Sequence, residues 1–417
     1  MPIMSRRRLA ALPIALALAA TACGSSSKTA TSTATTKGAT ATTTGAATTA
    51  AATATSAAGT ATTKASATTA VASLAGSLKG VCPDKLVIQT DWFPESEHGT
   101  LYEMIGKDYK VDTQKKVVTG TLVGHGGVDT GIQIEVRTGG PATGFKDPDA
   151  IMATDSSINI GYTGSNKATN WTKAPLLQVM APLEKNPQII MWDPATYPNV
   201  KTIEDLAKAG VIINTFNKDV MALFVAEGKV PDSLVDPSYD GSPARFVASG
   251  GKIAQQGFAS AEPYSYEKEF KQWAKPVAYQ LFFDAGYQDY SQTLGVRPAD
   301  LDKLKPCLKV FVPMVQQASV DFITSPDRAN AIIVDAVAQY KDTWVYSKAL
   351  ADYSVATMKK LGIISNGPDK TLGNFDIPRV QTFIDKEIKS GGFTTIPAGF
   401  KAETMVTNDF IDPTIGL

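Results

Sequence analysis

The segment 91–106, DWFPESEHGTLYEMIG, brings together the side chains of this chain that are best suited to chemistry: carboxylates, large aromatic rings and one of the two histidines. A carboxylate beside an imidazole can serve acid–base catalysis or hold a metal, and carboxylates among aromatic rings can line a binding pocket. A metal needs further ligands at a suitable spacing, and the other histidine, His125, stands in a glycine-rich segment without them. The sequence therefore predicts no metal at His98.

Asp91, Trp92 and Phe93 are the first candidates for contact with a ligand. Asp91 can accept hydrogen bonds from a ligand, and the aromatic rings beside it can stack on one. The alternative is structural, with Asp91 capping the helix that follows and Trp92 partly buried. His98 opens that helix and has either a ligand hydrogen bond or an ordinary surface role. Tyr102, one turn further on, shares its face of the helix and is a candidate contact for that reason.

Nucleophilic catalysis finds little support in the sequence. No G-x-S-x-G motif occurs, and a serine–histidine pair would have to use His98 or His125. Neither Cys82 nor Cys307 lies in a cysteine-rich cluster. The segment 120–131, GTLVGHGGVDTG, lacks the third glycine of a dinucleotide-binding loop and lies between two strand-like runs, so we expect a hairpin turn there. We therefore expect no enzymatic activity and no cofactor.

The elements that must position these side chains alternate between short apolar strands and amphipathic helices, which predicts an α/β protein with parallel βα units. Strands are predicted within 85–93, 132–137, 158–164, 176–183, 187–194, 200–216, 252–264 and 274–286. Helices are predicted within 97–106, 202–210, 217–230 and 376–389, and over most of the chain after residue 301. Thr202 with Asp205 forms a variant of the capping box, and Ser325 with Pro326 marks another helix start.

Ligands of parallel βα units bind at the carboxyl ends of the strands. Three predicted strand ends besides that of Asp91 carry polar, aromatic and glycine residues, and they fall in two parts of the chain, which favours a cleft with one wall from each of two lobes. The candidate ligand contacts at these ends are Gly161, Tyr162, Thr163, Gly164, Thr215, Asn217, Ser260, Glu262 and Tyr264. Glu262 can bind an amine or a ring N–H, and its alternative role is a capping carboxylate at a helix start.

The beginning of the chain is typical of an exported protein. Three arginines at 6–8 precede an apolar run at 9–20 that is too short to span a bilayer stably. Small residues before Cys23 predict a signal peptide at 1–22 and a lipid on the Cys23 thiol; plain secretion is the alternative, since Ala20 stands where leucine is usual. The segment 23–78 is Ala, Thr, Gly and Ser with a few Lys, and we expect a disordered tether because it offers almost nothing to bury.

Composition limits the remaining possibilities. Cys82 and Cys307 form an even pair in an oxidising compartment, which favours a disulfide over two buried thiols. The chain has 40 basic and 40 acidic residues, so the net charge is about −3 without the leader arginines. No basic stripe appears, and nucleic acid is not an expected partner. The roughly 340 residues after the tether suffice for two lobes with cores of their own.

Several motifs follow one another in an order that resembles a known family. They are DWFP and HGTLY within 91–102, INIGYTGSNKA at 158–168, VKTIEDLAKAGVIINTF at 200–216 and FASAEPYSYEKE at 258–269. With the leader and the tether, they resemble the solute-binding proteins of ABC importers, in the group that binds thiamine-pyrimidine precursors, sulfonates, taurine and nitrate. The resemblance covers about 85–392 and implies a two-lobed, type II periplasmic-binding-protein-like α/β fold. Lobe I would comprise 79–187 plus 288–417 and lobe II 188–287, with crossing strands near 184–189 and 282–287.

The resemblance also implies roles for the glycine turn at 161–164. Asn159 stands where the family commonly has aspartate, whereas Gly161 and Gly164 keep its Gly-x-x-Gly pattern, in which backbone N–H groups face the ligand. It further implies a monomeric receptor on the outer face of the cell membrane, with a small-molecule ligand, an ABC permease as partner and no cofactor. The protein would bind by closing its lobes.

The ligand class follows from the candidate residues. Carboxylates with aromatic rings favour a neutral or cationic heterocycle, such as a pyrimidine or another vitamin precursor, because anion sites need Arg, Lys or backbone N–H donors. A sulfonate, taurine or nitrate-type anion is the alternative within the same fold. An envelope-anchored enzyme that acts on a vitamin-like small molecule is the alternative of another class.

Overall fold

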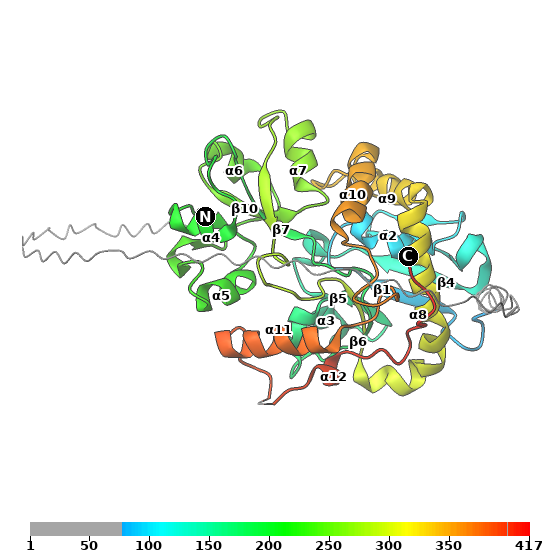
Figure 1. Ribbon diagram of the computed structural model, residues 1–417. Helices are drawn as coiled ribbons and strands as arrows, with labels where there is room; N and C mark the ends of the chain where they lie inside the picture. Colours follow the sequence, from blue (N-terminus) through cyan, green and yellow to red (C-terminus); the bar gives the residue numbers. More distant parts are fainter. Residues whose placement is uncertain (1–76, 398) are drawn as a thin grey trace, which may run out of the picture. The chain divides into compact units, whose positions relative to one another are not determined.

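The computed structural model describes residues 77–397 and 399–417. The predicted signal peptide, the predicted lipidation site Cys23 and residues 23–76 of the predicted tether lie outside these residues. Two mixed β-sheets organise the described part, with helices packed around them (Figure 1). Within the described residues, no helix has the length and apolar character needed to cross a bilayer.

The strands fall into a larger and a smaller sheet. The larger sheet contains β1 (Lys85–Gln89), β2 (Lys110–Asp112), β3 (Val117–Val123), β4 (Asp129–Arg137), β5 (Ile160–Thr163), β6 (Leu177–Met180) and β12 (Thr293–Val296). The smaller sheet contains β7 (Gln188–Trp192), β8 (Ile213–Asn214), β9 (Val235–Asp236), β10 (Ala254–Phe258) and β11 (Ala278–Leu281). The helices are α2 (Gly99–Glu103), α3 (Pro148–Met152), α4 (Ile203–Lys208), α5 (Asp219–Ala226), α6 (Ala244–Ala248), α7 (Glu262–Tyr264), α8 (Leu301–Thr324), α9 (Asp327–Tyr340), α10 (Lys348–Leu361), α11 (Ile377–Ser390) and α12 (Ala402–Met405).

The larger sheet has the order β2-β3-β4-β1-β5-β12-β6. Its centre is parallel, as the alternation of strands and helices predicts, because β1 pairs in parallel with both β4 and β5. The strands on either side of this centre pair antiparallel, so the sheet is mixed. The hairpin β3–β4 has a connection too short for a parallel crossover, and β12 runs antiparallel to both β5 and β6.

The smaller sheet has the order β11-β7-β10-β8-β9, with β10, β8 and β9 parallel and β7 and β11 antiparallel to their neighbours. The chain passes from the larger to the smaller sheet between β6 and β7 and returns between β11 and β12. We call the two parts that these sheets organise the larger-sheet lobe and the smaller-sheet lobe. The lobe boundaries at 187/188 and 287/288 remain predictions.

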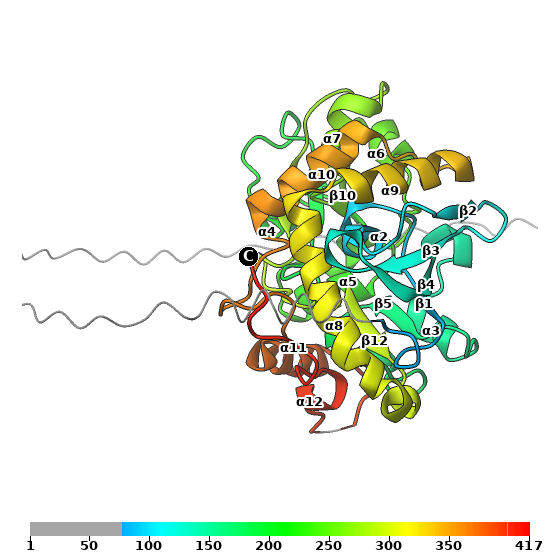
Figure 2. The ribbon, with the colours of Figure 1, turned by 90° about the vertical axis from the view of Figure 1, so that its right-hand side faces the viewer.

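Helix α8 provides much of the core of the larger-sheet lobe. Its buried residues Leu308, Phe311, Val315 and Phe322 recur at the three- to four-residue spacing of an amphipathic helix. Figure 2 shows α8 crossing the face of this lobe, with α9 and α10 above it. Gly99 of α2 allows the close approach of these helices, since a Cβ there would lie 2.1 Å from the ring of Phe322.

The helix starts agree closely with the sequence pattern. The Thr202 hydroxyl accepts from the Asp205 N–H at 3.1 Å and the Asp205 carboxylate accepts from the Thr202 N–H, which confirms the predicted capping box. Helix α9 begins at Asp327, one residue later than predicted, with Pro326 at the cap. The first predicted helix is shorter than 97–106, because a 3₁₀ turn over 96–98 precedes α2.

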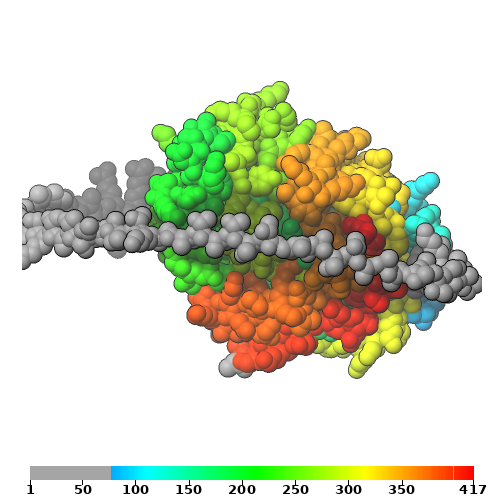
Figure 3. Space-filling model, in the orientation of Figure 1, coloured from blue at the N-terminus to red at the C-terminus, as the bar shows by residue number. Residues whose placement is uncertain are grey.

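The segment after β12 does not pack on the larger-sheet lobe alone. Helix α11 also contacts α5 of the smaller-sheet lobe. Val380 and Phe383 of α11 share one buried cluster with Phe224 and Tyr287, and the rings of Tyr287 and Phe383 lie 4.9 Å apart. Figure 3 shows α11 (orange) on the surface below the green segments of the smaller-sheet lobe. Helix α11 therefore contacts both lobes, and the assignment of 288–417 to lobe I remains a prediction.

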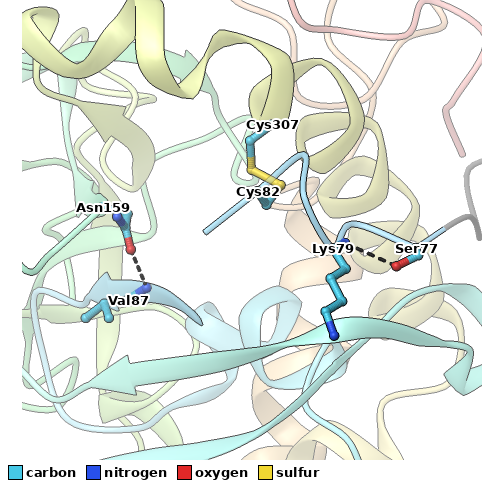
Figure 4. The surroundings of a disulfide bond; sticks show 6 residues. All are labelled: Ser77, Lys79, Cys82, Val87, Asn159 and Cys307. Carbon is cyan, nitrogen blue, oxygen red and sulfur yellow. Dashed lines mark hydrogen bonds between the residues drawn. A yellow bond between two sulfur atoms is a disulfide. The ribbon is translucent and has the colours of Figure 1, made fainter. Parts of the chain in front are cut away.

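A disulfide joins Cys82, just before β1, to Cys307 of α8, with Cα atoms 4.6 Å apart (Figure 4). This bond confirms the predicted pairing. Leu78 already belongs to the folded part, because it is buried and its N–H donates to the carbonyl of Thr130 at 2.8 Å. Asn159 is part of the framework as well, since its side-chain oxygen accepts from the N–H of Val87 in β1 at 2.8 Å.

Candidate functional site

A cavity of about 580 Å³ is lined by residues that follow strands of both sheets. Its volume lies in the range that small-molecule ligands occupy. The lining residues of the larger-sheet lobe include Asp91, Trp92, Glu95, Phe145, Lys146, Asp147, Thr163, Gly164, Lys167 and Trp344. Those of the smaller-sheet lobe include Phe216, Asn217, Tyr239, Asp240, Phe258 and Glu262. The strand ends therefore meet at one cavity, as the rule for α/β sheets requires.

Five rings form one side of the cavity, which we call the aromatic wall: Trp92, Phe145, Phe216, Tyr239 and Trp344. The ring of Trp92 is central, 5.6 Å from Phe216 and 6.1 Å from Trp344, with interplanar angles of 67° and 87°. Phe216 in turn lies 4.5 Å from Tyr239. Since Trp92 belongs to one lobe and Phe216 to the other, the aromatic wall also joins the lobes.

The turn after β4 holds Trp92 in place. The N–H of Gly139 donates to the carbonyl of Trp92 at 3.0 Å. Both positions of this turn require glycine, because the backbone here passes too close to Thr90 and Trp92 to leave room for a Cβ atom. A Cβ on Gly139 would lie 2.2 Å from the carbonyl oxygen of Thr90, and one on Gly140, where φ is +58°, would lie 2.5 Å from the Trp92 ring.

Asp91 is held by a buried histidine. The Nε2 atom of His98 lies 2.8 Å from Oδ1 of Asp91, and the amide of Gln292 donates to Asp91 at 3.3 Å. His98 is fully buried behind Asp91, so its imidazole orients the carboxylate and cannot itself contact a molecule in the cavity.

Two further buried carboxyls, Glu97 and Glu262, come from different lobes. The Ser260 hydroxyl of the smaller-sheet lobe donates to Glu97 of the larger-sheet lobe. Glu262 accepts from the N–H of Phe258 at 2.6 Å and from the Tyr239 hydroxyl at 3.4 Å. Burial raises the pKa of Glu262 to about 7, against the opposing effect of the Phe258 N–H. Burial also raises the pKa of Glu97, and the hydrogen bond from Ser260 offsets only part of this shift.

Glu95 lies among these groups. Its carboxyl is 5% exposed, and burial, followed by the charges of Glu97, Asp91 and Glu262, raises its pKa well above the usual range. The Nε2 atom of the His98 imidazole lies 3.9 Å from Oε1 of Glu95.

Ion pairs and amides line the other end of the cavity. Lys167 binds Asp147 at 2.8 Å, which makes it a poor donor for an anionic ligand. The Asn186 amide donates to Asp289 at 2.6 Å, and these two residues come from the two connections between the sheets. Burial raises the pKa of Asp289 to about 6, although Asn186 and the Arg379 charge oppose the shift.

Six predicted contacts lie in the lining: Asp91, Trp92, Thr163, Gly164, Asn217 and Glu262. The remaining eight lie elsewhere. His98 and Ser260 stand behind the lining and bind Asp91 and Glu97. That any of these residues contacts a ligand remains a prediction.

Phe93, Tyr102 and Tyr162 are predicted ligand contacts, but the structure buries all three in the core of the larger-sheet lobe. The physical reason is the course of the chain after β1, which turns inward at Phe93. Tyr162 points away from the cavity, and its hydroxyl donates to the carbonyl of Glu97 at 3.2 Å.

Gly161, Thr215 and Tyr264 are also not in the lining. Gly161 is a packing position, since a Cβ there would lie 2.6 Å from the sulfur of Met152. The Thr215 hydroxyl donates to the carbonyl of Asn217 and fixes the turn after β8. Tyr264 packs against Tyr353 of α10, with ring centroids 5.2 Å apart.

Sequence reasoning misses Glu95, Phe145, Tyr239, Trp344 and Asp289 as lining residues. Phe145 could have been found, because it follows a glycine-rich turn at the end of a predicted strand. Trp344 could not, because it lies in the connection between α9 and α10, about 250 residues from the segment that it contacts.

The buried carboxyls predict an unusual pH dependence of stability. Below about pH 4.5 both the folded and the unfolded states keep the proton of Glu262; between about 4.5 and 7 only the folded state keeps it. The free energy of unfolding of the empty protein should therefore fall as the pH rises through this window, by up to about 1.4 kcal/mol per pH unit for each such group. Denaturant unfolding at a series of pH values measures this slope.

Two variants show whether the slope comes from carboxyls with raised pKa values. Glu262→Gln should lessen the slope between pH 4.5 and 7 by up to about 1.4 kcal/mol per pH unit, while the other buried carboxyls keep their contributions. Glu135→Gln should not, because burial raises the pKa of Glu135 but Lys85 and Arg137 outweigh it and lower the pKa overall, so its contribution changes only at lower pH. Identical slopes in the wild type and in Glu262→Gln would contradict the prediction.

Comparison with solved structures finds similar folds at low sequence identity. The periplasmic aliphatic sulphonate binding protein SsuA from Escherichia coli is 13% identical, with 80% of this chain and 93% of that chain covered and a TM-score of 0.50. The periplasmic nitrate-binding protein NrtA from Synechocystis is 12% identical, with 78% and 86% covered and a TM-score of 0.49. The ligand binding component of an ABC-type import system from Staphylococcus aureus, with zinc bound, is 15% identical, with 79% and 97% covered and a TM-score of 0.48.

No protein-family model and no curated protein matches this chain. The likeness to the Escherichia coli protein, together with the two mixed sheets and the two connections between them, settles the architecture. The predicted α/β fold is confirmed: the described part of the chain has the fold of the periplasmic binding proteins.

Proposed function

We propose that this protein is the extracytoplasmic substrate-binding component of an ABC importer and that it captures a small organic molecule by closing its lobes. The observation that carries the proposal is the cavity whose lining comes from both lobes, with an aromatic wall that takes rings from each of them. A ligand that contacts both walls shifts the population towards the closed form, which then docks on a permease. The predicted lipid on Cys23 would hold this monomeric receptor at the outer face of the membrane.

The favoured ligand is a neutral or cationic heterocycle, such as a pyrimidine or another vitamin precursor. The aromatic wall offers ring faces and edges for stacking, and the carboxyls of Asp91 and Glu262 can accept from ring N–H or amino groups. These are the features that a flat molecule with hydrogen-bond donors needs.

A sulfonate, taurine or nitrate-type anion is the second candidate, because Lys146 and Lys167 lie in the lining. The ion pair of Lys167 with Asp147 weakens this alternative, since an anion would have to compete with a carboxylate for the ammonium group.

Native mass spectrometry of freshly purified protein is the first test, since a closed receptor retains a tight ligand. We expect an adduct of small-molecule mass that is lost on denaturation. A thermal-shift screen with heterocycles and alkyl sulfonates then ranks the classes. Stabilisation by alkyl sulfonates and none by heterocycles would overturn the favoured ligand, and chemical turnover of the retained compound would instead support an enzyme.

A further inference from the structure

The lining of the cavity is strongly acidic. It contains six carboxyl groups and two lysines. The carboxyls are those of Asp91, Glu95, Asp147, Asp240, Glu262 and Asp289. Lys167 is already paired with Asp147, so little positive charge remains to balance the others. A ligand that enters this cavity meets a negative electrostatic environment in which a low dielectric strengthens every charge interaction.

Glu95 differs from the other buried carboxyls because it has no hydrogen-bond donor. Glu97 accepts from Ser260, and Glu262 accepts from the Phe258 N–H, but the Glu95 side chain has no hydrogen bond with any residue in 77–397 or 399–417. It is nevertheless 5% exposed and lines the cavity. A carboxyl that faces the cavity without a hydrogen-bond donor from the protein can bind a ligand that supplies one, and Glu95 is such a group.

Two indole rings, those of Trp92 and Trp344, line the same cavity as this carboxyl. The indole N–H of Trp344 donates to the carbonyl of Pro94, the residue next to Glu95, at 3.3 Å. The faces of indole rings attract cations, and a carboxylate beside them adds a counter-charge. The lining therefore offers two independent attractions for a positive group.

We propose that the ligand of this cavity is an organic cation, whose protonated nitrogen is bound between the carboxyls of Glu95 and Glu262 and whose apolar part packs on the aromatic wall. This proposal rests on the function proposed above and narrows its ligand to a positively charged one. Because Glu95 belongs to the larger-sheet lobe and Glu262 to the smaller-sheet lobe, the cation joins both lobes. It also removes the repulsion that arises when closure brings these carboxyls together, and so favours the closed form.

The test uses three probes of equal ring and similar size that differ in charge: benzylamine, which is a cation at pH 7.5, benzyl alcohol, which is neutral, and phenylmethanesulfonate, which is an anion. Thermal unfolding of the full chain is measured with each. We expect benzylamine to raise the Tm by about 2–3 °C at ten times its Kd, and the other two to have much smaller effects.

Variants assign the effect to Glu95. Glu95→Gln should abolish the benzylamine shift and at the same time raise the Tm of the empty protein, because burial raises the pKa of Glu95 and a group whose pKa is raised on folding destabilises the fold at pH 7.5. Glu262→Gln should reduce the shift. Glu387→Gln is the matched control: Glu387 is also a buried glutamate whose pKa is raised to about 7, but it lies on α11 outside the lining, so the benzylamine shift should remain.

The outcomes separate the two proposals. Equal or greater stabilisation by the alcohol or the sulfonate would overturn the cation while leaving the receptor function intact. A benzylamine shift that survives Glu95→Gln would place the cation elsewhere and overturn the assignment. No shift with any probe, together with no retained compound in native mass spectrometry, would overturn the receptor function and the cation with it.

Discussion

Replacement of Trp92 by alanine is expected to weaken ligand binding by about 30- to 100-fold, which corresponds to ~2–3 kcal/mol. The ring is the centre of the aromatic wall and contacts Phe145, Phe216 and Trp344. Its loss removes both a stacking surface for the ligand and the contact with Phe216 that joins the lobes in the closed form. Isothermal titration with the compound retained by the native protein, or with the best compound of the screen, measures the change.

The control is another tryptophan in a comparable position. Trp171 is half-buried like Trp92 and packs edge-to-face on a phenylalanine ring, Phe400, at 5.4 Å, but it does not line the cavity. Trp171→Ala should therefore destabilise the fold without changing the affinity. Trp92→Phe should recover part of the binding, because a smaller ring keeps the contact with Phe216. An affinity that is unchanged in Trp92→Ala would show that the ligand binds elsewhere.

The sequence predicts the architecture well because it depends on local patterns. The capping box of Thr202 and Asp205 and the apolar strand before Asp91 follow from rules that act over a few residues. The pairing of Cys82 with Cys307 follows from the assignment of Cys23 to a lipid, which leaves these two cysteines as a pair in an oxidising compartment. The hairpin of β3 and β4 follows from such rules as well. The antiparallel pairing of β12 does not, since it depends on how the chain returns from the smaller-sheet lobe.

The site is predicted less completely, because a residue type at a strand end does not fix the direction of its side chain. Asp91 and Trp92 face the cavity, but Phe93, the next residue, turns into the core. Tyr102 follows the helix face of His98 as predicted, and that face is buried against the core. Trp344 enters the site through tertiary packing between distant parts of the chain, which a single sequence does not encode in any local pattern.

The charge of the cavity lining does not follow from the fold of this molecule. The lining has six carboxyls and two lysines. Lining residues on turns after the strands can change without altering the sheets. The framework therefore does not determine the ligand, and the side chains that line the cavity carry that information.

Removal of the disulfide, by Cys82→Ser together with Cys307→Ser, is expected to lower the free energy of unfolding by about 5 kcal/mol. The bond closes a loop of 225 residues, which includes most of the folded part, so it restricts the unfolded chain strongly. Denaturant unfolding of the double variant and of the wild type, with and without reductant, measures the effect. Reductant should destabilise the wild type and leave the double variant unchanged.

The same variant tests whether the bond serves the fold or the site. Strand β1, which leads from Cys82 to Asp91, is paired with β4 on one side and β5 on the other, so the backbone of the site has its own support. The double variant should therefore bind ligand within about twofold of the wild type while it is folded, since small differences of this size correspond to well under 1 kcal/mol. A large loss of affinity in the folded double variant would mean that the position of β1, and with it Asp91 and Trp92, depends on α8. A loss of stability alone would mean that the bond acts through the unfolded chain, as the length of its loop predicts.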